Sequence, residues 1–351
     1  MATNTTYLLG AGASCNRLPI ISNLSERILL FRDILKSPRL GLSLRGQPNF
    51  NQQSFRSFKN DLVTDLEWIA SEGKKHNTVD TYAKKLFLQG KNIELHRLKV
   101  ALSICFFYWQ FHDGRGGDDS NPNIDPRYIS LMSAFLTKKN NEIILPEHVN
   151  IITWNYDVQP ELALQYFLED EKYVSTVQNK FKSYPNSNGE QATGMHQIVH
   201  LNGIAGLIQS GPHTGFLFDD LHCQYRDFDK MLIQIMSFYT SCIYNISGEK
   251  TAHINHTFSF AWEENPISKK SVEHAVNIMK TTTHVIIIGY SFPVFNREID
   301  RKLFQGRRNL QKIYYQDPNP DAKAFSETFG ITTGVVQELT KTDQFFLPFE
   351  F

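Results

Sequence analysis

Short apolar segments are separated along the chain by long stretches in which apolar and polar residues are mixed. Five of the apolar segments end close to a polar turn: Thr6–Leu9, Val149–Thr153, Gln197–Leu201, His284–Ile288 and Lys312–Gln316. Continuous apolar runs of this length are typical of parallel strands that helices cover on both faces. We therefore predict an α/β fold with a Rossmann-like, doubly wound parallel sheet.

Two long regions between these strands have other patterns. Helical periodicity in Asp61–Ser71, Val79–Leu88 and Ile93–Phe111 predicts a helical insertion subdomain over about 31–144. A second insertion, over about 211–279, contains many aromatic residues and histidines, and we expect it to mix helix with irregular chain. We expect a single domain over 1–351, with its Rossmann-like core formed by about 1–30, 145–210 and 280–340.

A tight turn, Gly10-Ala11-Gly12-Ala13-Ser14, follows the first predicted strand. Two glycines let the backbone turn sharply and approach a phosphate closely, and a following helix would direct its free N–H groups there. The dinucleotide fingerprint G-x-G-x-x-G is incomplete, because Cys15 replaces its third glycine. The turn alone is therefore a weak signal for a nucleotide site.

Thr153-Trp154-Asn155-Tyr156-Asp157 ends the second predicted strand. Asn155 and Asp157 have the same parity, so their side chains leave the strand on one side. An amide and a carboxylate there can hold ribose hydroxyls, and the carboxylate can stabilise positive charge as a glycosidic bond breaks. An ordinary Asn/Asp turn with a helix cap at Asp157 explains the same residues.

Two other strand ends carry candidate chemistry. His200 precedes the turn Asn202-Gly203, and a histidine, whose ordinary pKa is about 6.5, can act as a general base or serve as a hydrogen-bonded structural residue. Gly289-Tyr290-Ser291 offers backbone N–H groups and a hydroxyl to a phosphate or a ribose. It lacks the second glycine of the nucleophile elbow of serine hydrolases.

Composition narrows the classes of function. The 36 basic and 36 acidic residues leave no net charge to attract nucleic acid. The loop 113–119 lacks the final glutamate of a calcium site. No secretory leader or membrane-length apolar run is recognised, so we expect a cytoplasmic protein. No C-x-x-C pair, and hence no structural zinc site, is expected from the four cysteines: Cys15, Cys105, Cys223 and Cys242.

Taken in order, the four turns resemble the motifs of the sirtuin superfamily, and specifically its bacterial sirtuin-like NAD-hydrolase branch of antiphage defence. That family has a Gly-Ala-Gly-x-Ser turn, a Thr-x-Asn-x-Asp segment, a His-Gly pair with the catalytic histidine, and a late Gly-x-Ser. Leu18-Pro19 also matches the family's loop over the nicotinamide ribose. The likeness spans residues 8–320. Protein-deacylating sirtuins carry a four-cysteine zinc module, and its absence from this sequence argues against a peptide deacylase.

The resemblance implies that NAD is the substrate and is cleaved to nicotinamide and ADP-ribose, with no metal. It implies that Asn155 positions water and ribose and that Asp157 contacts the ribose or the developing cation. We assign the general base to His200. The NAD-binding residues that it implies are Gly10, Ala11, Gly12, Ser14, Asn202, Gly289, Ser291 and Asp317.

The resemblance also implies a biological setting. Members of this branch deplete NAD during phage infection, which is a form of abortive infection. We therefore expect a homo-oligomer controlled by a separate partner, namely a HerA-type ATPase or, alternatively, an Argonaute-type protein. No direct contact with nucleic acid or with a membrane is expected.

One departure from the family leaves two interpretations open. The family's Leu-His-Gly aligns with Leu201-Asn202-Gly203, so an asparagine stands where the catalytic histidine belongs. Residues 200 and 202 point to the same side of a strand, about 6.5 to 7 Å apart, so His200 could take over the role. Otherwise the chain is a catalytically impaired NAD or ADP-ribose sensor, or a regulatory subunit.

Overall fold

The structure divides into two compact units. It is a computed structural model that describes residues 3–37, 52–111, 124–168, 173–186, 196–210, 213–216, 228–243 and 254–349. The first unit comprises Met1–Asn16, Ile124–Ile204 and Ser259–Phe351, and the second comprises Arg17–Asn123 and Ala205–Phe258. These limits differ from the expected insertions, because a helix near residue 130 and another near residue 270 belong to the first unit. The organisation as a single domain stays a prediction.

A seven-stranded sheet forms the centre of the first unit, with the strand order β12-β11-β10-β1-β4-β6-β5. Every pairing within it is parallel. The five predicted strands all belong to this sheet, so the predicted α/β fold with a Rossmann-like parallel sheet is confirmed. Its strands are β1 (Thr5–Leu9), β4 (Val149–Thr153), β5 (Ser183–Tyr184), β6 (Ile198–His200), β10 (His284–Ile288), β11 (Lys312–Gln316) and β12 (Val336–Leu339).

The carboxyl ends of four strands lie side by side in this sheet. Leu9 pairs with Ile288 on one side and with Thr153 on the other. Thr153 in turn pairs with His200. The strand order reverses at β1, because β4 and β6 are added on one side of it and β10 and β11 on the other. Ligands of open α/β sheets bind outside the carboxyl ends of the strands at such a reversal, so the polar turns occupy a favourable position.

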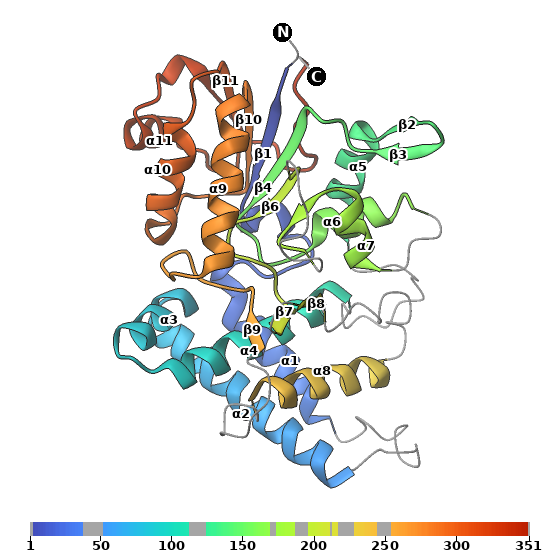
Figure 1. The fold of residues 1–351 in the computed structure, drawn as a ribbon. Coiled ribbons are helices and arrows are strands. Elements are labelled where there is room, and N and C mark those ends of the chain that lie inside the picture. The colour runs from blue at the N-terminus through green and yellow to red at the C-terminus, as the bar shows by residue number, and fades with distance from the viewer. Residues whose placement is uncertain are drawn as a thin grey trace. The chain divides into compact units, whose positions relative to one another are not determined.

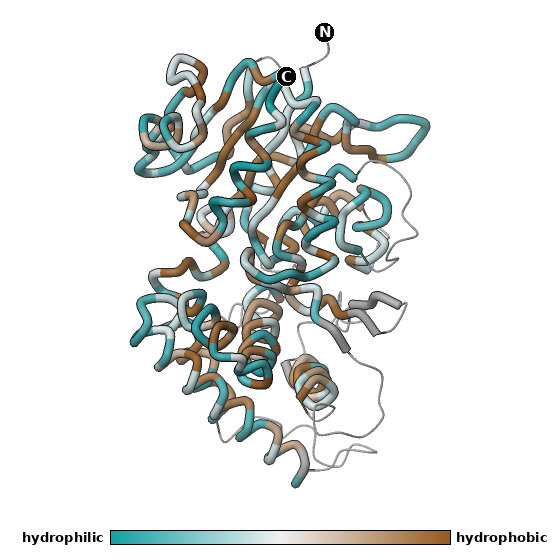
Figure 2. The backbone as a smooth tube through the Cα atoms, turned by 60° about the vertical axis from the view of Figure 1, so that its left-hand side comes forward, coloured by the Kyte–Doolittle hydropathy of each residue, from teal (hydrophilic) through white to brown (hydrophobic). Residues whose placement is uncertain are grey.

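Helices cover both faces of the sheet (Figure 1). Helices α9 (Pro266–Thr281), α10 (Arg297–Gln305) and α11 (Ala322–Phe329) share one core with the sheet strands. On the other face, Tyr7 of β1 meets Phe135 of α5 (Pro126–Phe135), with ring centroids 5.2 Å apart. Figure 2 shows hydrophobic colouring along the sheet strands. The first unit also contains α6 (Gln159–Gln165), α7 (Val174–Lys180) and the hairpin of β2 (Thr137–Lys139) and β3 (Glu142–Ile144).

The aromatic segment near the C-terminus packs on the first unit. Phe345 is buried, and its ring lies edge-on to that of Tyr128 at 5.0 Å. The carbonyl of Phe346 accepts a hydrogen bond of 3.0 Å from the Tyr7 hydroxyl. Phe349 is 99% exposed, and the last two residues lie outside the described part. Up to Phe346, therefore, the segment is part of this unit's own packing.

The second unit is mainly helical. It contains α1 (Leu24–Lys36), α2 (Gln52–Lys75), α3 (Val79–Leu88), α4 (Asn92–Phe111), α8 (Phe228–Ile243) and an antiparallel sheet of β7 (Leu207–Ser210), β8 (His213–Phe216) and β9 (Ile254–His256). The three predicted helices lie within α2, α3 and α4. Asp65 of α2 accepts a 2.7 Å hydrogen bond from Tyr239 of α8 and pairs with Arg97 of α4, which links the three helices. The short strands β7 to β9 were not predicted.

The described residues contain neither a membrane-spanning helix nor a cluster of metal ligands. None of their helices is both long enough and apolar enough to cross a membrane. None of their His, Cys, Asp and Glu side chains form a group of three or more that could hold a metal ion. Cys15 is exposed, whereas Cys105 and Cys242 are buried. Cys223 and the loop 113–119 lie outside the described residues.

Candidate functional site

The turn after β1 packs directly against the turn after β10. The N–H of Gly12 donates a 2.9 Å hydrogen bond to the carbonyl of Gly289. A Cβ atom on Gly10 would lie 2.5 Å from that same carbonyl oxygen, so no larger residue fits. Both glycines of the first turn are therefore needed for the packing of the chain itself. Ala11, between them, is exposed and leaves the outer side of the turn open to a ligand.

Replacing Gly289 with alanine is expected to destabilise the fold by about 3 kcal/mol or more. Gly289 has a φ of +57°, and a Cβ there would lie 2.5 Å from the nitrogen of Ala13 and from the Cα of Gly12. Urea unfolding of the variant measures the loss. Gly334→Ala is the matched control, because nothing lies within 4 Å of its Cβ position. An equal effect of both substitutions would contradict this interpretation.

Ser14 is the centre of a buried network of hydrogen bonds beneath the turn. Asn155 donates one amide hydrogen to the carbonyl of Gly10 at 3.0 Å and the other to Ser14 Oγ at 3.2 Å. Tyr128 of α5 lies 3.2 Å from the same hydroxyl. Ser14 also hydrogen-bonds Asp157. Because serine has a single proton, Ser14 donates to the Asp157 carboxylate and accepts from Asn155 and Tyr128.

A buried histidine and a second carboxylate, His200 and Glu161, act on Asp157 through their charges. His200 Nε2 lies 2.8 Å from Glu161 Oε1, and both side chains are fully buried. Burial raises the pKa of Asp157 to about 6, against the lowering effects of the Gln159 N–H, the Ser14 hydroxyl and the His200 charge. Burial alone would lower the pKa of His200. The charge and hydrogen bond of Glu161, with smaller effects of Asp157 and the Asn155 carbonyl, instead hold it above its ordinary value.

An arginine on α5 supports the turn from inside the protein. Arg127 donates to the carbonyl of Ala13 at 3.0 Å and pairs with Asp125 at 2.6 Å. It also donates to the carbonyl of Thr342 at 3.1 Å, near the C-terminal segment. Sequence reasoning missed Arg127, together with Tyr128 and Glu161. For Glu161 a signal existed, since it follows Asp157 by four positions, but no local pattern links α5 to the turn.

Asp300 of α10 joins two of the candidate turns from the opposite face of the sheet. Its carboxylate accepts from Trp154 Nε1 at 3.1 Å and from the Tyr290 hydroxyl at 2.8 Å. The rings of Trp154 and Tyr290 stack with their centroids 5.9 Å apart. Burial raises the pKa of Asp300 to about 7, although both of these hydrogen bonds and the charge of Arg297 lower it.

The stability of the chain should therefore depend on the protonation of Asp300. Its pKa is raised in the folded state, so the unfolding free energy falls as the pH rises from about 4 to about 7, by on the order of 3 kcal/mol. Asp300→Asn removes this pH dependence, so the unfolding free energy of the variant rises relative to that of the wild type on going from pH 5 to pH 8. Chemical denaturation of both proteins at these two pH values measures the difference. The same substitution at the exposed Asp343 should change nothing, and a pH-independent difference for Asp300→Asn would refute the argument.

The remaining predicted residues are not part of the Ser14 network. Asn202 donates from Nδ2 to the Tyr156 hydroxyl at 3.5 Å. Ser291 is exposed after β10, and the carboxylate of Asp317 accepts from the N–H of Asn319 at 2.9 Å. Residues 18 and 19 belong to the second unit.

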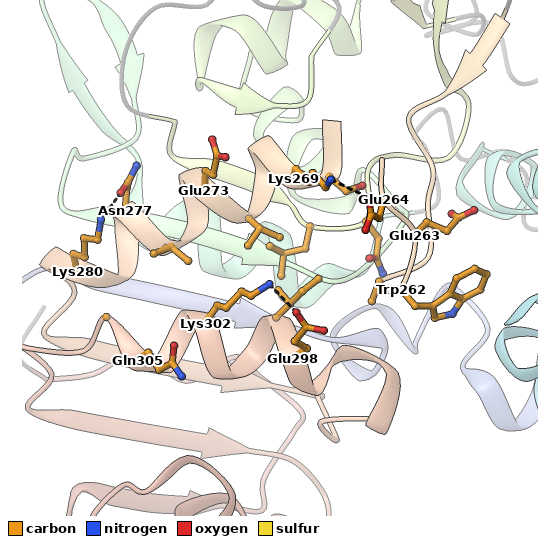
Figure 3. Close-up of a pocket in the computed structure, with 18 residues that line it drawn as sticks. Trp262, Glu263, Glu264, Lys269, Glu273, Asn277, Lys280, Glu298, Lys302 and Gln305 are labelled. Carbon is orange, nitrogen blue, oxygen red and sulfur yellow. Dashed lines mark hydrogen bonds and ion pairs between the residues drawn. The ribbon is translucent and has the colours of Figure 1, made fainter. Parts of the chain in front are cut away.

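A cavity of about 1050 Å³ lies beside Asn202, between α9 and α10 (Figure 3). Its three lysines already have partners. Lys269 pairs with Glu264 at 3.2 Å, and Lys302 pairs with Glu298 at 2.8 Å. Lys280 donates to the side chain of Asn277 at 2.9 Å. Because these contacts already engage the three lysine side chains, the cavity is a less favourable binding site for a diphosphate than the turn after β1.

Comparison with known proteins gives no family model and no curated protein that matches this chain. Among solved structures, a Sir2 protein in complex with an inhibitor, 2'-O-acetyl-ADP-ribose and a deacetylated peptide is 11% identical, with a TM-score of 0.38. A Sir2 protein bound to an acetylated peptide is 11% identical, with a TM-score of 0.37. Both alignments cover 96% of this chain and 87% of the other. Because such TM-scores are low, the fold is assigned from the strand order, and function is argued from the site alone.

Proposed function

We propose that this chain is an NAD glycohydrolase that cleaves NAD to nicotinamide and ADP-ribose. One observation carries the proposal: buried hydrogen bonds join Asn155, Ser14 and Asp157 beneath the turn after β1, and the charge of the buried His200 acts on the Asp157 carboxylate. Such a network fixes a carboxylate and an amide at the reversal of the strand order, where α/β sheets bind nucleotides.

In this proposal, the turns after β1 and β10 hold the diphosphate. Ala11 and Ser291 are exposed residues, and we assign the Ala11 N–H and the Ser291 hydroxyl to phosphate oxygens. Asp317, after β11, would contact the adenosine. The other residues assigned to this side of the ligand are Gly10, Gly12, Ser14, Asn202 and Gly289.

The proposed reaction breaks the bond between the nicotinamide nitrogen and the ribose. The bonding electron pair leaves with the nicotinamide, and water adds to the resulting oxocarbenium-like carbon. Asp157 stabilises the developing positive charge, and Asn155 orients the ribose and the water. The proton of the water passes to the buried group of Asp157 and His200, with His200 as the general base.

We also propose a biological role, which rests on the sequence motifs. The enzyme would act in the cytoplasm as the toxic effector of an antiphage system that depletes NAD. A toxic hydrolase has to stay inactive until infection, so we propose control by homo-oligomerisation and by a HerA-type ATPase, with an Argonaute-type protein as the alternative partner.

One observation favours a second function, a nucleotide sensor without catalysis. His200 is fully buried and its Nε2 is engaged by Glu161, while Asn202 occupies the family's histidine position. A proton from the attacking water can reach a general base that is so enclosed only through Asp157. If it is not reached, NAD binds without being cleaved.

Calorimetry and chromatography together separate the two functions. The purified chain is titrated with NAD, and the same mixture is assayed for nicotinamide, alone and with its ATPase partner. The hydrolase predicts binding with release of nicotinamide. Binding with intact NAD in both conditions would favour the sensor, and no binding would overturn both proposals.

A further inference from the structure

Glu161 lies at the start of α6, four residues after Asp157, and faces the end of β6. Its Oε1 is 2.8 Å from His200 Nε2, and its other oxygen, Oε2, has no hydrogen-bond partner among the described residues. An ionised carboxylate accepts and cannot donate, so with Glu161 ionised the His200 Nε2 carries the proton of this hydrogen bond. The contact therefore selects one tautomer and one ring orientation.

Such a pair is costly to bury unless each charge is compensated. The ionisable groups that face His200 are Glu161 on α6 and Asp157 in the loop before it. Tyr128 of α5 acts on Asp157 from the other side. With both carboxylates ionised, a neutral His200 would leave two buried negative charges uncompensated. A protonated His200 balances one of them, so His200 accepts a proton as the general base only at a pH above its own midpoint, where the ring is neutral.

We propose that Glu161 is a positioning residue that fixes the orientation and the protonation of His200 against Asp157. The effect of Glu161 on catalysis rests on the proposed hydrolase function, whereas the positioning of His200 does not. Asp157 and His200 then influence each other's protonation, and Glu161 places a negative charge beside His200. Asp157 is hydrogen-bonded to Ser14 below the turn, and in the proposed reaction it is the carboxylate that meets the substrate.

Glu161→Gln tests this positioning, because it keeps the shape of the side chain and removes its charge. The titration of His200 is followed by NMR of the histidine rings, with His200→Gln used for assignment. We expect the midpoint to fall by about one pH unit or more in Glu161→Gln. Glu327→Gln, at an exposed position on α11, should leave it unchanged. An unchanged midpoint in folded Glu161→Gln would overturn the proposal.

A second measurement covers the case in which Glu161→Gln does not fold. In the wild-type chain, the Nε2 proton of His200 should be visible in nitrogen-edited spectra and protected from exchange with water. A rapidly exchanging Nε2 proton, or a proton on Nδ1 alone, would also overturn the proposal.

The catalytic consequence has its own readout. In Glu161→Gln, the pH profile of kcat for nicotinamide release should shift in the same direction as the NMR midpoint, with little change in KM for NAD. A shifted midpoint with an unshifted kcat profile would remove Glu161 from the reaction. A shifted midpoint with no nicotinamide from the wild-type chain would instead overturn the hydrolase, and the positioning of His200 would stand.

Discussion

Asn155→Ala is expected to reduce nicotinamide release from NAD by about 100-fold or more. The side chain uses both amide hydrogens to hold the Gly10 carbonyl and the Ser14 hydroxyl, so its loss frees the turn and the residue that orients Asp157. Alanine removes one donor from each of these two acceptors, which keep the Ala13 N–H and the Tyr128 hydroxyl, so the cost is about 1 kcal/mol of stability. The fold should survive this loss. The measurement is kcat and KM for NAD, with circular dichroism as the check on folding.

The expected loss lies in kcat more than in KM, because the network acts on the reacting end of the ligand. Asn60→Ala, at an exposed position on α2, is the matched control and should retain full activity. Undiminished turnover in folded Asn155→Ala would remove this residue from the site.

The second large effect is expected at His200. His200→Gln should lower nicotinamide release by about 100-fold, because glutamine can donate to Glu161 and cannot take up a proton. Alanine is the harsher choice, since it leaves the buried Glu161 carboxylate uncompensated at a cost of about 3 to 5 kcal/mol. Both variants are assayed for nicotinamide release, and thermal unfolding reports whether they fold.

Asn202→His, assayed in parallel, decides between the two positions for the base. The side chain at 202 contacts Tyr156 and lines the cavity beside α9, away from the Ser14 network. The variant should therefore leave kcat unchanged, and any loss should appear in KM, because Asn202 is assigned to the binding side of the ligand. A large gain in rate for Asn202→His, with no loss for His200→Gln, would place the base at 202 and contradict the assignment.

The pattern of apolar residues predicted five strands of the central sheet, and the reason is physical. The strands at 149–153, 284–288 and 312–316 were predicted at the limits observed, because strands buried on both faces have to be continuously apolar. Strand β12 was missed, since it lies at the sheet edge, where its side chains are exposed or half-buried. The antiparallel strands β7 to β9 were missed because each is only three or four residues long.

The positions of the candidate residues were predictable only where they follow strand ends. The structure places Asn155, Asp157 and His200 after or at the ends of neighbouring parallel strands, as the sequence predicted, and their roles stay predictions. Tyr128 and Arg127 could not be found this way. They reach the turn through the packing of α5 against the sheet, which depends on tertiary contacts between residues more than a hundred positions apart.

The most direct measurement is the stoichiometry of products formed from NAD. The wild-type chain, alone and with the proposed HerA-type ATPase, is incubated with NAD, and nicotinamide and ADP-ribose are quantified together over time, with Asn155→Ala as the blank. A hydrolase at this site predicts equal amounts of both products from the wild-type chain and almost none from the variant. NAD that remains intact with the wild-type chain in both conditions would contradict it.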